Sequence, residues 1–298
     1  MIDKEAIASE FMYAQDRICS SLELLDGSKT FHEDPWVRPE GGGGRSRIIE
    51  RGKVIEKGGV NFSKVFGEVP AFMKAETKKT KEAKIFFATG VSIVIHPLSP
   101  WVPIIHMNIR YFENDNGDSW FGGGIDLTPH YVDPVDAKYF HQSLKELCSL
   151  HQVADYSVFK KEADDYFFIR HREETRGIGG IFFDHLRPGT HGTKEQLLAF
   201  VLGLANLFSP LYTELVQRKM KLSYGEPEKK WQHLRRGRYV EFNLVYDRGT
   251  KFGLETNGRT ESILMSLPPI AYWEYNFVPG PASKEHETTS LLRKGIDW

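Results

Sequence analysis

The 298-residue chain has a net charge of −1, with 40% hydrophobic and 27% charged residues, which is the composition of an ordinary soluble globular protein. Because the charges nearly cancel, no overall field attracts a polyanion, so we expect no nucleic acid partner and expect individual arginines to bind any acidic ligand. One basic run, residues 229–239, also contains aromatic side chains and keeps an RNA-binding alternative open. The two cysteines, Cys19 and Cys148, match neither a disulfide framework nor a zinc motif, which fits a reducing compartment.

The N-terminal segment, residues 1–18, is acidic early and amphipathic, unlike a secretory signal or a transit peptide. The longest apolar run, residues 197–208, is shorter than the roughly 20 residues that a membrane-spanning helix needs. We therefore expect no membrane span and a cytoplasmic location.

The first part of the chain predicts one helix and then a series of strands. Apolar residues recur at helical spacing and Gly27 follows as a stop signal; they are Ile7, Phe11, Ala14, Ile18, Leu22 and Leu25. Residues 41–44 are four glycines and predict a flexible loop. Four strand-like runs follow, separated by Gly, Pro and Asn-Gly turns, at residues 85–87, 91–95, 104–112 and 120–127. Short links between successive strands predict antiparallel pairing.

The second part predicts helices followed by further strands. Helices are expected at residues 133–150 and 156–171, and a third begins at a capping box formed by Thr193 and Gln196. Pro210 should kink or break that third helix. Strands are expected at residues 180–183 and 238–246, and a turn-rich loop at residues 253–259.

The order of these elements predicts the fold class. Strands, then helices, then strands again indicate an α+β protein whose sheet draws on both halves of the sequence. No internal repeat and no Pro- or Ser-rich linker marks a boundary, so residues 1–298 are expected to form a single domain.

Common catalytic and cofactor motifs do not occur. The glycine clusters that begin at residues 41, 122 and 177 do not complete G-x-G-x-x-G, and none is followed by Gly-Lys-Ser/Thr. The sequence also contains no Gly-x-Ser-x-Gly, Cys-x-x-Cys or His-Glu-x-x-His. Nucleotide, flavin, acyl-transfer and ordinary zinc sites therefore lack their usual signals, and an enzyme would have to rely on the reactivity of its substrate.

The segment WFGGGIDLTP at residues 120–129 is the most informative motif. Three glycines there allow a ligand to approach the backbone closely, and Asp126 follows them in apolar surroundings where it needs a partner. Together with GIGGIFFD at residues 177–184 and RRGRYVEFNLVYDRGTKFGLETNGRTESILMSLPP at residues 235–269, it resembles oxygen-dependent coproporphyrinogen III oxidase, a family of the haem pathway. The segments ATGVSIVIHP and IIHMNIRYFE add to the resemblance, which runs from about Trp36 to the C-terminus.

The resemblance implies a large, rather flat antiparallel β-sheet covered by helices on both faces, in a homodimer. It also implies the reaction, in which two propionates of coproporphyrinogen III become vinyl groups of protoporphyrinogen IX. Molecular oxygen is the electron acceptor and co-substrate, CO2 and H2O2 are by-products, and no cofactor is required. Because the unconjugated pyrroles are electron-rich, the protein has to orient the substrate, stabilise charge and move protons.

The resemblance also implies site residues, while the residue chemistry suggests their roles. By resemblance, substrate contacts fall on Ser92, on the triplet Asn108, Ile109 and Arg110, and on the triplet Asn257, Gly258 and Arg259. Arginine suits propionates because its planar fork can form two charge-assisted bonds, so Arg110 and Arg259 are the expected carboxylate ligands. Asp126 is expected to accept from pyrrole N–H groups. His106 shares a strand face with Arg110 and matches the family's proton donor, although the sequence alone favours a core histidine.

Metal is treated as dispensable. Four histidines match positions described as metal ligands in bacterial relatives: His96, His106, His141 and His171. Their spacing does not identify a site, because only the first two could meet across a hairpin, and His171 shares a predicted helix face with Phe167.

Two departures from the family pattern are Ile125, where alanine is common, and Asn257, where glycine is common. Ile125 could narrow the pocket, and a backbone contact at residue 257 is less secure. The alternative function, from another class, is that of a tetrapyrrole-binding or carrier protein without turnover. The presence of Asp126 and His106 favours catalysis over this alternative.

Overall fold

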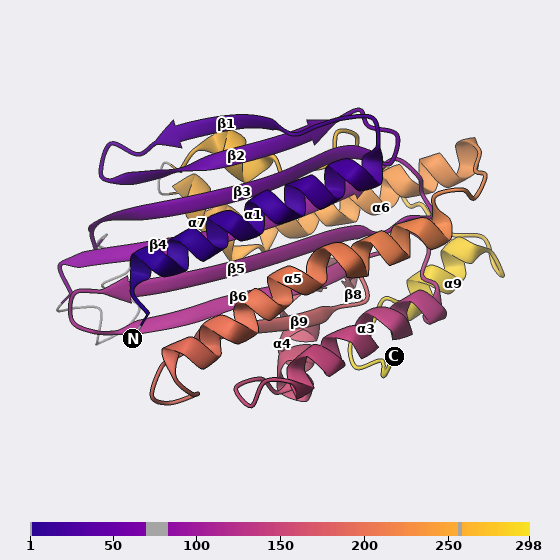
Figure 1. The fold of residues 1–298 in the computed structure, drawn as a ribbon. Helices are drawn as coiled ribbons and strands as arrows, with labels where there is room; N and C mark the ends of the chain where they lie inside the picture. The colour runs from indigo at the N-terminus through magenta and orange to yellow at the C-terminus, as the bar shows by residue number, and fades with distance from the viewer. Residues whose placement is uncertain (1, 70–82, 256–257) are drawn as a thin grey trace.

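The computed structural model describes residues 2–69, 83–255 and 258–298. Its main feature is a seven-stranded antiparallel sheet with the order β1-β2-β3-β4-β5-β6-β9 (Figure 1). These strands are β1 His32–Val37, β2 Gly42–Glu50, β3 Ile55–Glu68, β4 Ile85–Pro97, β5 Ile104–Asn114, β6 Ser119–Thr128 and β9 Gly180–Leu186. A separate pair is formed by β7 Phe168–Ile169 and β8 Glu174–Thr175. Because β9 follows two helices but pairs with β6, the sheet joins both halves of the sequence, as predicted.

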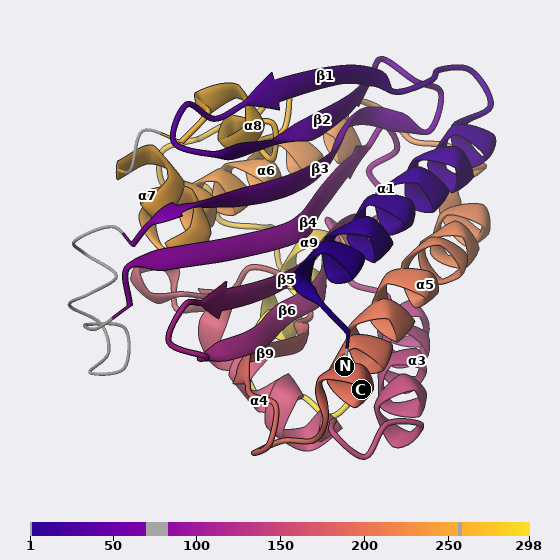
Figure 2. The same cartoon turned by 60° about the vertical axis from the view of Figure 1, so that its left-hand side comes forward.

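Helices cover both faces of the sheet (Figure 2). The described helices are α1 Lys4–Asp26, α3 Pro134–Ser149, α4 Tyr156–Tyr166, α5 Lys194–Lys219, α6 Glu226–Val245, α7 Arg248–Glu255, α8 Thr260–Leu264 and α9 Lys284–Leu291. Helices α1, α3 and α5 lie on one side of the sheet, and α6, α7 and α8 lie on the other side. This confirms the predicted α+β architecture with a large antiparallel sheet.

The main hydrophobic core lies between the sheet and helices α1, α3 and α5. On β5, alternate side chains such as Ile105, Met107 and Ile109 enter this core and are fully buried. The residues that alternate with them on β5 face the other layer. The first helix forms as its pattern predicts: the Asp3 side chain accepts from the Ala6 N–H, and Gly27 ends the helix with φ +65°.

Helix α5 begins at the predicted capping box of Thr193 and Gln196 and continues through Pro210, so of the two predicted effects of Pro210, a kink or a break, the break does not occur. Within the described residues, α5 is long and apolar enough to cross a membrane by length and composition alone. Its residues Phe200, Val201 and Phe208 are fully buried in the main core, which is the pattern of a core helix in a globular protein.

The predicted strand at residues 238–246 is wrong, because this segment belongs to α6. Its alternation of apolar and polar residues resembled a strand, but Tyr239 and Phe242 are buried at helical spacing. Tyr239 packs against β4 and β5 of the sheet, and Phe242 packs against α4 and β7. Tertiary packing therefore overrides the local preference of the β-branched and aromatic residues. Helix α7 likewise occupies the first part of the loop predicted at residues 253–259.

Two smaller predictions also need correction, and one strand was missed. The glycines at 42–44 belong to β2, where a Cβ at Gly44 would lie 2.5 Å from the ring of Trp36, so glycine allows the edge strand to pack closely. That edge strand, β1, was not predicted. The helix predicted at residues 156–171 ends at Tyr166, and His171 lies in a short 3-10 turn at Arg170–Arg172.

Candidate active site

A cavity of about 270 Å³ lies on the α6 side of the sheet. Its floor is the central strands β3 to β6, and its walls come from α4, β9, α6, α7 and α8. The lining residues are Asn61, Ser92, Val94, His106, Asn108, Arg110, Gly123, Gly124, Tyr166, Arg176, Phe182, Tyr239, Asn243, Asp247, Gly249, Thr250, Ser262, Ile263, Met265 and Ser266. The lining therefore combines a small polar floor with aromatic walls and a few charged groups, as ligand sites commonly do.

Strand periodicity brings several predicted residues to the cavity. His106, Asn108 and Arg110 alternate along β5 on the cavity face, which confirms the prediction that His106 and Arg110 share a face. Ser92 is the register partner of Asn108 on the neighbouring strand and also lines the cavity. Ile109 differs, because its fully buried side chain enters the main core on the opposite face. Only the backbone of Ile109 could therefore contact a ligand here.

His106 is held by a hydrogen bond to Asp126 on the neighbouring strand. The two residues are register partners on β5 and β6, and the His106 Nδ1–H donates to Asp126 Oδ1 at 2.7 Å. This bond assigns the proton to Nδ1, so Nε2 is the nitrogen left for a ligand. Asp126 is only 1% exposed and does not line the cavity, which differs from the predicted direct contact with pyrrole N–H groups.

Arg176 occupies both oxygens of Asp126 and was not predicted from the sequence. Its Nη2 donates to Asp126 Oδ1 at 2.7 Å and to Oδ2 at 2.8 Å, and its Nη1 donates to Asn243 Oδ1 at 2.8 Å. The guanidinium carbon also lies within 5 Å of three aromatic ring centres, at 4.5 Å from Phe167, 4.7 Å from Tyr239 and 4.6 Å from Phe242. The only sequence signal was its position directly before the glycine cluster at residues 177–180.

The charges of this buried pair stabilise each other. Burial by itself would raise the pKa of Asp126, but the positive charge of Arg176 and the hydrogen bond from His106 outweigh it and lower that pKa. Burial likewise tends to lower the pKa of Arg176, and the charge of Asp126 reverses the shift. Asp126 therefore remains a carboxylate. Its hydrogen bond with Nδ1 fixes the orientation of the His106 imidazole.

Arg110 is the more accessible of the two guanidinium groups in the described cavity lining. Its side chain is 38% exposed, whereas that of Arg176 is 2% exposed. The Arg110 Nη1 donates to Asn108 Oδ1 at 3.1 Å, and its Nη2 lies 2.9 Å from Asp184 Oδ1. Arg110 is thus placed to receive an acidic group from a ligand.

The second predicted substrate segment lies at the edge of this cavity. Asn257 falls outside the described residues. Gly258 donates its N–H to the Gly253 carbonyl at 2.8 Å, and Arg259 pairs with Asp34 of β1. Neither Gly258 nor Arg259 lines the cavity, although Ser262 on the following helix does. Ile125, the other departure from the family pattern, is fully buried in the main core, so it does not narrow this cavity.

The four candidate metal-ligating histidines lie in separate surroundings. Among the described residues, no three His, Cys, Asp or Glu side chains form a group that could hold a metal ion. His96 is buried with Nε2 2.8 Å from the Ser266 carbonyl, and burial lowers its pKa well below the usual value. His141 lies between Tyr156 and the Ile178 carbonyl, and burial lowers its pKa to about 4. His171 contacts Tyr246 and Glu241.

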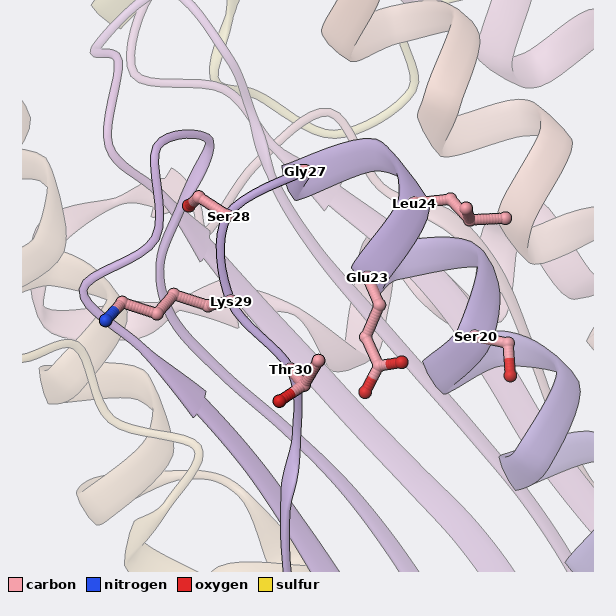
Figure 3. A pocket seen from close by; sticks show the side chains of 7 residues that line it. All are labelled: Ser20, Glu23, Leu24, Gly27, Ser28, Lys29 and Thr30. Atoms are coloured by element: carbon pink, nitrogen blue, oxygen red, sulfur yellow. The ribbon is translucent and has the colours of Figure 1, made fainter.

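A second hollow, with a volume of about 610 Å³, lies at the C-terminal end of α1. Its lining side chains point in different directions, and Figure 3 shows Leu24 directed away from the others. Leu24 is 84% exposed, so this region is open surface and lacks the converging polar groups of the first cavity.

Known proteins resemble the chain over almost its full length. The family model described as coproporphyrinogen III oxidase matches residues 6–298. Proteins named oxygen-dependent coproporphyrinogen-III oxidase from Synechococcus sp. (strain CC9902) and Parasynechococcus marenigrum (strain WH8102) are 47% and 48% identical to it. These alignments cover 99% and 96% of this chain, and 87% and 85% of the relatives. A relative of the same name from Prochlorococcus marinus (strain MIT 9313) is 46% identical over 95% of this chain and 87% of its own length. The chain therefore belongs to the coproporphyrinogen III oxidase family and is an oxygen-dependent oxidoreductase, as its motifs predict.

Proposed function

We propose that the cavity lined by His106 and Arg110 is where this chain carries out the aerobic oxidative decarboxylation of coproporphyrinogen III. The observation that carries this assignment is that one polar cavity is lined both by His106, whose imidazole is hydrogen-bonded to a buried carboxylate, and by the guanidinium of Arg110. These are the two functions that a tetracarboxylate substrate with reactive pyrroles requires. We also treat residues 1–298 as one domain, because β9 completes the sheet that the earlier strands begin.

The chemical balance of one step defines what the site residues have to do. One propionate, one O2 and one proton give one vinyl group, one CO2 and one H2O2. Two electrons leave the substrate for oxygen, the carbon–carbon bond to the carboxylate breaks, and one hydrogen leaves the side chain. The step is repeated at a second propionate. The protein has to bind the remaining carboxylates, stabilise the electron-poor pyrrole and provide a proton.

His106 is the residue that we assign to proton movement. The Asp126 carboxylate accepts from Nδ1, so Nε2 is the atom that exchanges a proton with the substrate or with reduced oxygen. Asp126 then acts as a positioning residue for the imidazole. Arg176 in turn fixes Asp126 and keeps it ionised, which makes the imidazole orientation independent of solvent.

Asp247 takes the role that the sequence suggested for Asp126. It lines the cavity, where its carboxylate accepts from the Tyr166 hydroxyl at 2.8 Å and the Thr250 N–H at 2.7 Å. A carboxylate can accept from pyrrole N–H groups and favour the positive charge that develops when electrons leave. We therefore propose Asp247 as the carboxylate that faces the pyrroles.

Arg110 is assigned to a propionate, with Ser92 and Asn108 as neighbouring hydrogen-bonding groups on the floor. At about 270 Å³ the cavity is slightly below the roughly 300–1,000 Å³ of typical small-molecule sites, so we propose that one pyrrole and its propionate enter at a time. Arg259, with Gly258 and Asn257, would then contact a carboxylate of the part of the macrocycle that remains outside.

We propose that the reaction needs no metal, flavin or nicotinamide, with O2 as co-substrate, because the electron-rich porphyrinogen itself can reduce oxygen. We also propose a cytoplasmic location and no membrane span. We propose no nucleic acid partner, because a net charge of −1 gives no overall attraction for a polyanion.

A homodimer, which the resemblance implies, is the proposed assembly. Exposed apolar side chains occur in the segment at residues 272–278, which contacts α6 through Tyr272 and Trp273; they are Tyr272, Trp273, Tyr275 and Val278. Aromatic-rich exposed surface is typical of protein interfaces, and we propose that a second copy covers it. Sedimentation should give a dimer, and Tyr275→Glu, at a side chain that is 93% exposed, should weaken it without loss of fold.

Oxygen uptake on addition of coproporphyrinogen III, with the vinyl product identified by mass, separates this function from that of a tetrapyrrole carrier. The enzyme should consume two O2 per protoporphyrinogen IX formed. His106→Gln should still bind substrate but lose most oxygen uptake. Tight binding of coproporphyrinogen by the wild-type chain without any oxygen uptake would support the carrier instead.

A further inference from the structure

Arg110 and Asp184 contact each other across a strand that separates them. Arg110 is on β5 and Asp184 is on β9, with β6 between the two strands. Arg110 Nη2 nevertheless lies 2.9 Å from Asp184 Oδ1. The residue opposite Arg110 on the intervening strand is Gly122, the first glycine of the GGG motif.

Gly122 is what allows this contact. A Cβ at this position would lie 2.7 Å from both Arg110 Nε and Asp184 Oδ1, and 2.9 Å from Arg110 Nη2. Any side chain there would therefore occupy the space in which the guanidinium and the carboxylate meet. The atoms that it would contact are the ends of two side chains, so they could move apart without unfolding the strand.

The guanidinium is fixed on both of its terminal nitrogens. Asp184 holds Nη2, while Nη1 donates to Asn108 Oδ1 at 3.1 Å. Asp184 itself accepts from the His185 N–H at 2.9 Å. Burial tends to raise the pKa of Asp184, but the charge of Arg110 outweighs this effect and lowers it. Asp184 does not line the cavity, but it contacts Arg110, which does, so Arg110 links it to the cavity.

We infer that Asp184 is a positioning residue that reaches through the gap at Gly122 and holds the Arg110 guanidinium on the sheet, ready for a substrate carboxylate. The inference rests on the proposed function, in which Arg110 binds a propionate. A free arginine would lose much of its rotational freedom on binding, whereas one that is already held loses less, so the gain should appear as substrate affinity. Gly122, the first glycine of the motif, is then required because it leaves the space in which these two side chains meet.

The test is a separation of KM from kcat. Asp184→Asn should raise KM for coproporphyrinogen by about tenfold, as expected when a charge-assisted contact is lost, and change kcat by less than about twofold. Gly122→Ala should also raise KM, because its methyl group would displace both the Arg110 guanidinium and the Asp184 carboxylate from their contact. Asp118→Asn is the control: it changes the partner of Arg187 in a more buried ion pair outside the cavity, and it should leave KM unchanged.

A double-mutant cycle identifies which assignment fails if the result is negative. With Arg110→Ala in place, adding Asp184→Asn should cause no further rise in KM, because the residue through which Asp184 acts is gone. An unchanged KM in Arg110→Ala alone would refute the proposed role of Arg110. If Arg110→Ala raises KM, three outcomes would overturn the role of Asp184 alone: no effect of Asp184→Asn, a lower KM, or an equal rise in both backgrounds. Melting temperatures close to wild type confirm that each variant is folded.

Discussion

Asp126 lies directly opposite His106 in the β5–β6 ladder, and its carboxylate accepts the His106 Nδ1–H at 2.7 Å. Arg176 donates to both oxygens of the same carboxylate, and Asp126 is only 1% exposed and does not line the cavity. The aspartate that the motif highlights therefore holds His106, the residue that we propose for proton movement. Substitutions at Asp126 and at His106 should therefore have different effects on stability and on turnover.

Asp126→Asn should reduce both stability and turnover. The amide removes the negative charge that pairs with Arg176, whose side chain is 2% exposed, and leaves a buried charge without its partner. Breaking a buried pair in this way typically costs about 3–5 kcal/mol of unfolding free energy. Denaturant unfolding and oxygen uptake measure the two effects. Asp165→Asn, at an exposed position, is the control. A variant with wild-type stability would show that the pair is not coupled to folding.

His106→Gln should lower kcat by about 10²–10⁴-fold, the usual range for loss of a general acid or base, while KM changes little. Glutamine keeps a hydrogen-bonding side chain of similar reach but cannot exchange a proton near neutral pH. Steady-state kinetics with coproporphyrinogen test this expectation. Turnover within a few-fold of wild type would remove His106 from the proton pathway.

Arg259→Ala should raise KM, because one charge-assisted carboxylate contact worth about 1.5–3 kcal/mol would be lost. The matched variant is Asp34→Asn, which removes the present partner of Arg259 but leaves the guanidinium in place. It should therefore keep or lower KM. Equal effects of the two substitutions would indicate that Arg259 only links α8 to β1.

Stability in acid should depend on Glu241. Burial would raise the pKa of this carboxylate, but hydrogen bonds from Arg172, His171 and Trp273 lower it from 4.5 to about 2. Since the folded pKa lies below the unfolded value, the contribution is complete above about 4.5 and is lost as pH falls through about 2. Melting curves between pH 7 and 2 should therefore show Glu241→Gln less stable than wild type at neutral pH, with the difference shrinking over this window.

The control for this pH series is Glu146→Gln, a substitution at an exposed helix position. It should parallel wild type at every pH. A constant difference between Glu241→Gln and wild type down to pH 2 would mean that packing, not the charge of Glu241, accounts for the loss.

Activity should persist after exhaustive chelation and without added flavin or nicotinamide, since the proposed chemistry draws its electrons from the porphyrinogen. The measurement is oxygen uptake by enzyme treated with chelator and then assayed in metal-depleted buffer. Activity that disappears and returns with one specific metal would contradict the proposal.

The sequence by itself determined the family, the antiparallel sheet and which residues of β5 share a face. Long motifs identify the family, and a strand period of two places His106, Asn108 and Arg110 together whatever packs around them. The first helix could also be predicted, because both of its ends carry local signals, at Asp3 and Gly27.

The tertiary structure alone decided what surrounds those residues. The segment at residues 238–246 alternates like a strand, but all except its last residue belong to α6. Burial of Tyr239 against the sheet and of Phe242 against α4 and β7 outweighs a weak local preference. Arg176 is 50 residues from Asp126 in the chain, and Asp184 reaches Arg110 only where β6 lacks a side chain. Pairings between segments so far apart depend on how the layers pack, and no local pattern carries that information.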